Sequence, residues 1–501
     1  MTTDFRNVIV IGTGNAALSA AISATDCGAN VIVLEKSPKK SFGGNSRLTT
    51  AALRIAFTDP EEVRSLLDDN FSDKAWNDIE IEKYSHKKYV EEVMNAGHGR
   101  PDRERVEWFT GQAFNIIKWL KEHGVKFDLA GYGTVNDSKD KALGKKRYPG
   151  GLVIQGRGGG HGLVTSEREY LESKNIDIHY DLNCFELIVS EMGDVRGVCA
   201  RGRDGVVRHF YGAVVLGCGG FEASNARRSQ FLGPEWDDIR QRCVKFNTGD
   251  MFMAAVRHGA GCRGHFTGAH ITPIDCDSPY VGGLDTCEKT NRLGFPWGIS
   301  VDKVGHRFIN EGKFWNIQTY VDVGRALLKL YDKVAFQVFD SDGMACCEPH
   351  YKRQKTFYKG NDLCEVAVKA GIHPNAFMKT IEEYNKACAH NTKPYDPAVL
   401  DGQRTKGLCP PKTNWALPIV KPPFYVYPVV PGVTFSFGGL NSNLSCEILD
   451  NSDIPIPGLY GCGEITGGYF YYAYPTGSGL IKGAVTGREA GKNAAAYAKS
   501  I

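Results

Sequence analysis

The first 36 residues pass from an apolar run to a helical pattern and back to an apolar run. Asn7 to Ile11 is a short run rich in β-branched side chains, and Val31 to Leu34 is a second one. The stretch between them is rich in alanine, which suits a helix packed closely on a sheet. Since two parallel strands need a crossover connection between them, the pattern predicts a βαβ unit.

Apolar periodicity predicts further elements along the chain. Within the charged segment 60–125, Val106 to Leu120 is the clearest amphipathic helix. Five strands are expected next, at Ile176–Tyr180, Cys184–Val189, Val195–Ala200, Val206–Tyr211 and Ala213–Leu216. Later elements are a helix at Met251–His258, a strand at Val334–Phe339, a helical pair at Asp362–Ala370 and Pro374–Ala389, and a long helix at Ser478–Ala498.

The character of the chain changes at about residue 240, which predicts an inserted domain. Aromatic, histidine and proline-rich loops replace the strands there, and glycine turns return after residue 405. We expect an α/β fold in which residues 1–239 and 406–501 form a Rossmann-like nucleotide-binding domain. Residues 240–405 are expected to form an α+β cap domain over the substrate.

The turn after the first strand predicts a dinucleotide site. Gly12 permits the tight turn, Gly14 lets the backbone approach a pyrophosphate, and Ala17 keeps the helix close to the strand. The helix N-terminus offers unpaired N–H groups to the phosphates. Glu35 lies about 20 residues beyond the glycines, where a carboxylate accepts hydrogen bonds from ribose hydroxyls.

Composition excludes several classes of protein. The 60 basic and 57 acidic residues are spread without blocks and give a net charge of +3, which argues against nucleic acid or an anionic membrane as partner. No apolar run is long enough for a transmembrane helix, and the first strand begins too early for a signal peptide, so we expect a soluble, cytoplasmic protein. The 15 cysteines contain no C-x-x-C pattern, so we expect reduced thiols and no bound metal.

Seven motifs, in this order, resemble the flavoprotein family of fumarate reductase and succinate dehydrogenase. They are GTGNAAL…VLEK, GGNSRLTTAALR, GRGGGHGLV, VVLGCGGFE, NTGDMFMAA, VGHRFINEG and the segment from IPGLYGCGEITGG to GREAG. Within the family the chain looks most like the tricarballylate dehydrogenase branch, with secondary similarity to the 3-ketosteroid dehydrogenases. The resemblance implies FAD and interconversion of a C–C single bond with a C=C bond beside a carbonyl or carboxylate.

The resemblance also implies the residues that contact FAD. The pyrophosphate would lie against Gly12, Gly14, Asn15 and Ala16, and the adenosine ribose against Glu35 and Lys36. The glycine turn of Gly43, Gly44, Asn45, Ser46 and Thr49 would line the pyrophosphate and the isoalloxazine. Asp250 and Glu464 would bond the flavin side, and Ser478, Gly479 and Leu480 would bring a helix N-terminus to the flavin pyrimidine.

The chain departs from the family at four positions. Leu48 stands where covalent members carry a flavin-bearing histidine, so we expect non-covalent FAD. Trp315 stands in place of an arginine proton donor, and Tyr474 replaces a substrate-clamping arginine. The dicarboxylate-binding His-Thr-x-Gly-Gly motif is altered to Phe435-Ser436-Phe437-Gly438-Gly439. Since two desolvated carboxylates need charged partners, fumarate and succinate are poor candidate substrates.

Aromatic residues dominate what remains of the expected substrate site. Tyr474 matches the carbonyl-binding tyrosine of the steroid dehydrogenases, and Tyr472 and Tyr320 are further candidates for proton transfer. Phe435 and Phe437 are expected nearby, with most of these rings open to a pure packing role. Arg157 and His161, in the glycine loop 156–162, are candidate substrate contacts, although a surface or structural role is equally open.

These observations favour an FAD enzyme acting on a moderately large, partly apolar molecule. One alternative is a tricarballylate-type dehydrogenase, for which Arg157, Arg54 and Lys482 would have to converge on a small polycarboxylate. Another is a carrier or sensor that binds FAD without turnover. Since no cysteine pattern supplies an internal relay, electrons are expected to pass to or from oxygen, another flavin or a separate redox protein.

Overall fold

The computed structural model describes residues 5–67, 71–131, 146–148, 150–284, 286–396 and 399–501. The chain divides into two compact units. Unit 1 contains residues 1–234, 243–269 and 434–501, and unit 2 contains residues 235–242 and 270–433. Two long strands, β14 (Cys262–Asp275) and β18 (Phe424–Leu440), begin in one unit and end in the other.

Unit 1 is built on a six-stranded sheet with the order β19-β20-β12-β1-β2-β8. The strands from β20 to β8 are parallel, and β19 is an antiparallel edge strand. β1 and β12 are buried along their whole length, as expected for a parallel sheet covered on both faces. The strands are β1 (Asn7–Ile11), β2 (Asn30–Leu34), β8 (Ile178–His179), β12 (Ala213–Leu216), β19 (Glu447–Leu449) and β20 (Pro455–Gly461).

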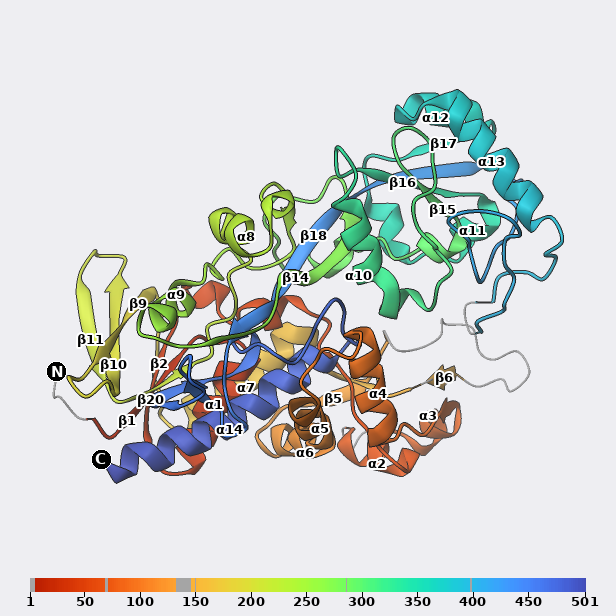
Figure 1. The fold of residues 1–501 in the computed structure, drawn as a ribbon. Helices are drawn as coiled ribbons and strands as arrows, with labels where there is room; N and C mark the ends of the chain where they lie inside the picture. Colours follow the sequence, from red (N-terminus) through yellow and green to blue (C-terminus); the bar gives the residue numbers. More distant parts are fainter. Residues whose placement is uncertain (1–4, 68–70, 132–145, 149, 285, 397–398) are drawn as a thin grey trace. The chain divides into compact units, whose positions relative to one another are not determined.

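Helix α1 (Asn15–Asp26) and helix α14 (Ser478–Ser500) pack against each other over one face of this sheet (Figure 1). Their contact is close because it is made by small residues. A Cβ atom on Gly487 would lie 2.2 Å from the Ala16 carbonyl oxygen, and one on Gly491 would lie 2.1 Å from that of Ala20. The first and last α-helices of the described chain therefore meet on the sheet, with α7 (Gly159–Ser173) packed beside α1.

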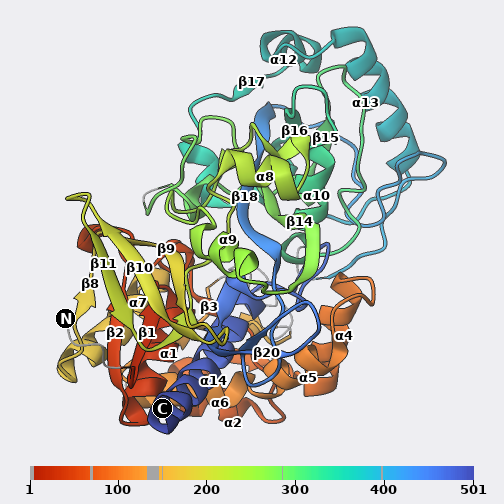
Figure 2. The ribbon, with the colours of Figure 1, turned by 60° about the vertical axis from the view of Figure 1, so that its left-hand side comes forward.

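The remaining elements of unit 1 surround this core. Figure 2 shows β9, β10 and β11 as a separate layer, which is an antiparallel three-stranded sheet. The elements are β3 (Ala52–Leu53), α2 (Pro60–Leu66), α3 (Asp73–Asn77), β4 (Ile79–Ile81), α4 (His86–Ala96), α5 (Arg103–Gly111), α6 (Ala113–Glu122), β5 (Phe127–Leu129), β6 (Lys146–Tyr148), β7 (Ile154–Gly156), β9 (Leu182–Val189), β10 (Val195–Gly202), β11 (Val207–Tyr211), α8 (Asn225–Phe231) and α9 (Asp250–Arg257).

Unit 2 has its own mixed sheet with the order β13-β18-β16-β15, and β14 and β17 also pair with β18. Helices α12 and α13 bury apolar side chains, including Val366, Phe377 and Ile381, against strand residues Ile299 and Val338. The elements are β13 (Arg240–Gln241), β15 (Ile299–Val301), α10 (Asn316–Leu327), β16 (Ala335–Phe339), α11 (Ser341–Ala345), β17 (Tyr358–Gly360), α12 (Leu363–Ala370) and α13 (Pro374–Cys388).

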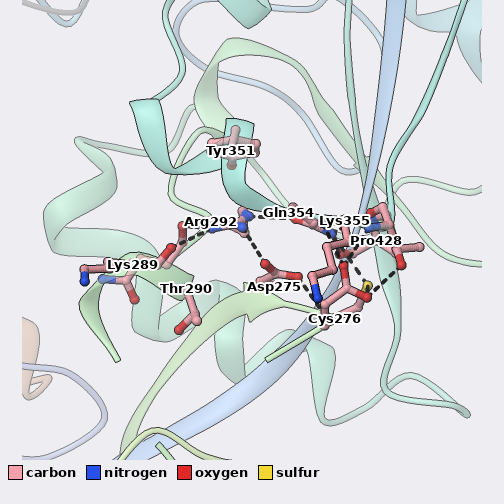
Figure 3. Close-up of polar contacts among 12 residues, drawn as sticks. Asp275, Cys276, Lys289, Thr290, Arg292, Tyr351, Gln354, Lys355 and Pro428 are labelled. Atoms are coloured by element: carbon pink, nitrogen blue, oxygen red, sulfur yellow. Dashed lines mark hydrogen bonds and ion pairs between the residues drawn. The ribbon is translucent and has the colours of Figure 1, made fainter. Parts of the chain in front are cut away.

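A fully buried arginine joins several segments of unit 2 (Figure 3). Arg292 Nη2 donates to Asp275 Oδ2 at 2.7 Å, and Arg292 Nε donates to Gln354 Oε1 at 2.7 Å. Its guanidinium also lies over the Tyr351 ring, 5.2 Å from the centroid. Gln354 in turn donates to the Pro428 carbonyl at 2.8 Å. The Arg292 guanidinium thus contacts β14 through Asp275, and it is linked to β18 through Gln354.

The α/β, Rossmann-like fold expected from the sequence is confirmed. One expected element is wrong: the single helix at Val106–Leu120 is two helices, α5 and α6, which part at Gly111 and Gln112. Glycine is a poor helix former, and Gln112 leaves the ideal helical geometry with ψ −5°.

The compact units overlap the expected domains but have different bounds. Residues 243–269 belong to unit 1, although they were expected in the inserted segment 240–405. Residues 406–433 belong to unit 2, although they were expected with the final segment. A change in composition does not reveal where β14 and β18 pass from one unit to the other.

Candidate functional site

A cavity opens in unit 1 at the carboxyl ends of β1, β2 and β12, where parallel α/β sheets bind ligands. It is lined by the turns that the sequence singled out. The expected cofactor residues on its wall are Gly12, Gly14, Ala16, Glu35, Lys36, Gly44, Asn45, Ser46, Asp250 and Glu464.

The turn from β1 into α1 has the shape that close approach of a ligand requires. Gly12 has φ 109°, and a Cβ atom there would lie 2.6 Å from the Gly217 carbonyl oxygen, so glycine is needed. Gly14 is extended, with φ −71°, and a Cβ there would meet only ordinary contacts. The absence of a side chain at Gly14 therefore serves the cavity and not the turn.

Glu35 is buried and held from two sides. Its Oε2 accepts from Thr13 Oγ1 at 2.5 Å, and its Oε1 accepts from the Ser37 N–H at 2.6 Å. Burial raises the pKa of Glu35, and these hydrogen bonds oppose the rise. Thr13 also accepts from the Gly43 N–H at 2.9 Å. Thr13, which no sequence pattern indicated, ties the acid at the end of β2 to the second glycine turn.

Lys36 and Asp250 form an ion pair on the cavity wall. Lys36 Nζ lies 2.7 Å from Asp250 Oδ2, and it also donates to Thr248 Oγ1 at 2.5 Å. Asp250 was expected, with Glu464, to bond the flavin side of the cofactor. Its carboxylate lies next to Lys36, which directly follows Glu35 at the end of β2.

The second glycine turn is held by its side chains as well as its backbone. Asn45 Nδ2 donates to Glu222 Oε1 at 2.8 Å and to the Thr434 carbonyl at 2.9 Å, while its Oδ1 accepts from the Val244 N–H at 2.9 Å. Ser46 Oγ accepts from the Asn15 N–H at 3.1 Å. The Asn45 amide is thus engaged within the protein, which leaves the backbone of the turn to face the cavity.

Two acids meet behind this turn, and only one of them was expected. Glu464 accepts through Oε1 from the Ser436 N–H at 2.8 Å, and its carboxyl group lies next to that of Glu222. Glu222 is fully buried, and its Oε1 also accepts from Asn247 Nδ2 at 2.8 Å. Burial raises the pKa of both acids, and the charge of Glu222 raises that of Glu464 further. An acid directly after Gly219-Gly220-Phe221, at the end of a predicted strand, was the available signal for Glu222.

The N-terminus of α14 lies against that of α1. Asn15 Nδ2 donates to the Leu480 carbonyl at 2.9 Å, while Asn15 Oδ1 is buried without a hydrogen-bond partner. Ser478 accepts from the Tyr89 hydroxyl at 3.0 Å and is fully buried. The glycine backbone and the start of α1 line the cavity and fit the phosphates of a dinucleotide, whereas Asn15 and residues 478–480 are not on its wall.

An aromatic cluster adjoins the start of α14. The Tyr474 ring contacts Phe435 and Phe470, each with a centroid distance of 5.2 Å, and Phe437 at 6.4 Å. A Cβ atom on Gly479 would lie 3.8 Å from Tyr474 Cε2. The structure therefore brings three expected site residues, Tyr474, Phe435 and Phe437, next to the expected cofactor residue Gly479.

The two other candidate tyrosines have partners of their own. Tyr472 has φ 60°, stacks on His98 at 4.6 Å, and its hydroxyl accepts from Arg100 Nη1 at 3.1 Å. In unit 2, the Tyr320 hydroxyl lies 2.9 Å from His270 Nε2. Burial and the Arg242 charge hold the pKa of His270 well below its usual value, so its neutral imidazole can accept from that hydroxyl.

The cations that a small polycarboxylate would need are engaged elsewhere. Arg157 pairs with Asp128 at 2.6 Å on the surface, and buried Arg54 pairs with Glu92 at 3.0 Å. Buried Lys482 donates to the carbonyls of Gly463 and Thr466. Each of the three cations therefore has its own protein partners within unit 1.

His161 lies in the first turn of α7 and not in a loop, as had been expected. Its exposed ring packs edge-on against Phe42 with a centroid distance of 6.2 Å. Partial burial and the charges of Arg47 and Arg168 lower the pKa of His161. The other predicted positions of this region, Thr49 and buried Leu48, belong to the second glycine turn, where Thr49 Oγ1 donates to the Ser46 carbonyl at 2.9 Å.

Across the described residues, no helix is both long and apolar enough to cross a bilayer. Those residues contain one group of side chains with metal-ligating spacing, Asp275, Cys276 and Asp277 in unit 2. Its carboxylates already accept protein hydrogen bonds, from Arg292 to Asp275 and from the Thr356 N–H to Asp277 at 2.6 Å.

Comparisons with known proteins agree with this geometry. The protein family described as "FAD binding domain" matches residues 7–481. The fumarate reductase (cytochrome) of Shewanella frigidimarina is 27% identical over 504 residues, covering 99% of this chain and 78% of that protein. The digoxin reductase of Eggerthella lenta is 25% identical over 523 residues, covering 98% of this chain and 87% of that protein.

Among solved structures, the fold is similar to a 3-ketosteroid Δ1-dehydrogenase from Sterolibacterium denitrificans. The TM-score is 0.74 at 20% identity, covering 98% of this chain and 99% of that one. At this identity the likeness concerns the fold.

Proposed function

We propose that this chain, which belongs to the FAD binding domain family, is an oxidoreductase that interconverts a C–C single bond and a C=C bond beside a carbonyl. The substrate is a moderately large, partly apolar molecule. The observation that carries the proposal is the placement of Tyr474 among Phe435, Phe437 and Phe470 beside Gly479 of α14. Both named relatives, one for fumarate and one for digoxin, are reductases.

The cavity of unit 1 is the place we assign to FAD. The backbone of Gly12 and Gly14 and the N-terminus of α1 would hold the pyrophosphate, with Asn15 Oδ1 as an acceptor for a cofactor hydroxyl. Glu35 and Lys36 would hold the adenosine ribose. The remaining assigned contacts are Ala16, Gly43, Gly44, Asn45, Ser46, Thr49, Asp250, Glu464, Ser478, Gly479 and Leu480.

We assign FAD as non-covalent because Leu48, a buried alkyl side chain, offers no nucleophile to the flavin. Denaturing the purified holoprotein in acid should release all of the yellow colour into the supernatant. Flavin retained on the precipitated chain would overturn this assignment. The measurement is independent of turnover and of the identity of the substrate.

When bound, FAD supplies a hydride acceptor or donor. The Tyr474 hydroxyl is then the group that protonates the carbon beside the carbonyl, takes its proton, or polarises the ketone by a hydrogen bond. The surrounding rings exclude water and bind apolar carbon. Tyr472, held by Arg100, and Tyr320, held by His270, are the second and third candidates for the proton-transfer group.

The engaged cations argue against a small polycarboxylate as the substrate. A desolvated carboxylate needs charge-assisted hydrogen bonds, and buried Arg54 already pairs with Glu92 and donates to the Thr476 carbonyl. Lys482 is likewise committed to two backbone carbonyls. Arg157 and His161, which are exposed, stay candidate contacts for a polar end of a larger substrate.

We propose a separate electron partner, which is oxygen, another flavin or a redox protein. The relative from Shewanella frigidimarina is named for a cytochrome. The cysteines of this chain are free thiols, of which Cys184, Cys243, Cys287, Cys388, Cys446 and Cys462 are buried.

Anaerobic flavin spectra test the proposal. The oxidised holoprotein is mixed with a saturated 3-ketosteroid or with tricarballylate, and the photoreduced holoprotein is mixed with a steroid-sized enone. Bleaching by the ketone, or reoxidation by the enone, is the expected result. Bleaching by tricarballylate alone would overturn the assigned substrate class, and a flavin that no organic acceptor reoxidises would identify a carrier or sensor.

A further inference from the structure

Glu222 is a fully buried acid at which three segments of the cofactor cavity meet. Its Oε1 accepts from Asn45 Nδ2 and from Asn247 Nδ2, each at 2.8 Å. Its other oxygen, Oε2, is buried next to the Glu464 carboxyl group and has no N–H donor there. Asn45 belongs to the second glycine turn, Asn247 to the turn before α9, and Glu464 to the turn after β20.

The space around these groups is closed. A Cβ atom on Gly220 would lie 2.2 Å from Glu464 Oε1, 2.6 Å from Ser436 Oγ and 2.8 Å from Glu222 Oε2. The backbone at Gly220 therefore packs directly against both acids. Glu464 reaches the cavity, whereas Glu222 stands behind it.

Two carboxyl groups form a hydrogen bond only when one of them carries a proton, because two carboxylates are both acceptors. Glu222 Oε1 already accepts two amide N–H groups, which favours the ionised form on Glu222. Glu464 is then the proton donor of the pair. Burial raises the pKa of both groups, which is consistent with one retained proton.

The charged side chains around Glu222 and Glu464 do not change the assignment of the proton to Glu464. Arg228, also fully buried, donates to the backbone carbonyl of Glu222 at 2.6 Å. Lys482 faces Glu464 and donates to the backbone on either side of it, at Gly463 and Thr466. The Lys36–Asp250 ion pair on the cavity wall carries no net charge.

We propose that Glu222 is a positioning residue for the cofactor: by sharing one proton with Glu464, it holds Asn45, Asn247 and Glu464 around the cavity with a single negative charge. The inference rests on the placement of FAD in this cavity. A second charge on the wall would repel the dianionic pyrophosphate, so the shared proton keeps the cavity able to bind it. Glu222 acts through its three partners and does not itself touch the cofactor.

Infrared spectra test the shared proton directly. Wild type should show one neutral-carboxyl C=O band that is absent from the spectra of both Glu222→Gln and Glu464→Gln. The same band is lost in both variants because either change leaves one ionised acid. The matched control is Glu167→Gln, a buried acid of unit 1 bonded to Ser19 and away from the cavity wall, which should remove a different band. A Glu222→Gln spectrum that keeps every neutral-carboxyl band would overturn the proposal.

Binding of FAD to the apoprotein tests the positioning role. Glu222→Ala should raise the Kd for FAD by at least about tenfold, since it removes the acceptor that the Asn45 and Asn247 amides share. Glu222→Gln should keep the Kd close to wild type, because its amide oxygen accepts from the asparagines and its N–H₂ donates to Glu464. Glu167→Gln should also leave the Kd unchanged. Tight binding by the alanine variant, or loss of binding by the glutamine variant, would overturn the positioning role.

Adding FAD to the apoprotein separates this inference from the proposed function. The shared-carboxyl band should shift when FAD is added, whether or not any enone is turned over. A band that FAD leaves unmoved would overturn the positioning role together with the placement of the cofactor. A chain that is inactive towards enones but shows the shift would contradict only the assigned substrate.

Discussion

Asn15 Nδ2 donates a hydrogen bond to the Leu480 carbonyl at 2.9 Å, and so joins the first turns of α1 and α14. The two residues are 465 positions apart in the sequence. A Cβ atom on Gly483 would lie 3.2 Å from the same Asn15 nitrogen. The bond sets the spacing of two helix N-termini, both of which we assign to the cofactor.

Gly14→Val should abolish retention of FAD while leaving the chain folded. Gly14 has an ordinary extended backbone, and the nearest atom to an added Cβ is Ser46 Oγ at 3.5 Å. The branched side chain would therefore fill the space of the pyrophosphate without straining the turn. The ratio of flavin to protein after gel filtration measures the effect, with Gly14→Ala as a milder control. A yellow valine variant would contradict the assigned site.

Tyr474→Phe should keep FAD and slow turnover by at least about tenfold, the usual contribution of an acid–base group. The ring contacts with Phe435 and Phe470 survive the change, so the loss would come from the hydroxyl. Tyr469→Phe is the matched control, because that residue lies in the same segment and is fully buried against Phe109. Equal turnover by both variants would remove Tyr474 from the mechanism.

Lys482→Met should change how stability depends on pH. Burial lowers the pKa of Lys482 from 10.5 to about 7. Between these values the unfolded chain binds a proton that the folded chain does not, so raising the pH favours the folded wild type. The free energy of unfolding of wild type should therefore rise relative to the methionine variant from pH 7 to pH 10.

Denaturant titrations at several pH values within that window measure the difference. Lys499→Met, on the exposed end of the same helix, is the control and should give a difference that does not vary with pH. A constant difference for Lys482→Met as well would show that the buried amine keeps an ordinary pKa.

Arg292→Met should strongly destabilise unit 2. The change leaves the buried carboxylate of Asp275 and the amide of Gln354 without their partner, and removing one member of a buried ion pair costs about 3–5 kcal/mol. The midpoint of thermal unfolding measures the loss. Lys369→Met, which breaks an exposed pair with Glu365, should leave the midpoint nearly unchanged. Similar midpoints for both variants would contradict the role given to Arg292.

Parts of the site that depend on local spacing were predictable from the sequence. Gly12, Gly14 and Glu35 follow from one strand–turn–helix–strand unit, whose geometry is set within 30 residues. Partners that lie far apart in the chain were not predictable. Asn45 was expected to contact the cofactor through its turn, but nothing local reveals that its side chain bonds to Glu222, 177 positions away.

The distance between partners in the chain also explains why the structural roles of Arg54 and Lys482 were not predictable from the sequence. Arg54 and Lys482 were candidates for a ligand because a charged side chain in isolation has no visible partner in a sequence. In the fold, Arg54 pairs with Glu92, and Lys482 donates to the turn that carries Glu464. Burial decides between a binding role and a structural role, and burial is a property of packing.

The order of apolar runs and glycine turns was sufficient to establish the Rossmann-like sheet and its dinucleotide turn. Their hydrogen bonds and steric limits act over a few residues, so the sequence pattern carries them. The meeting of α1 with α14, the pairing of Glu222 with Glu464, and the packing of Tyr474 beside Gly479 were decided only by tertiary structure. These contacts join distant segments, and their strength comes from exclusion of water once the chain has folded.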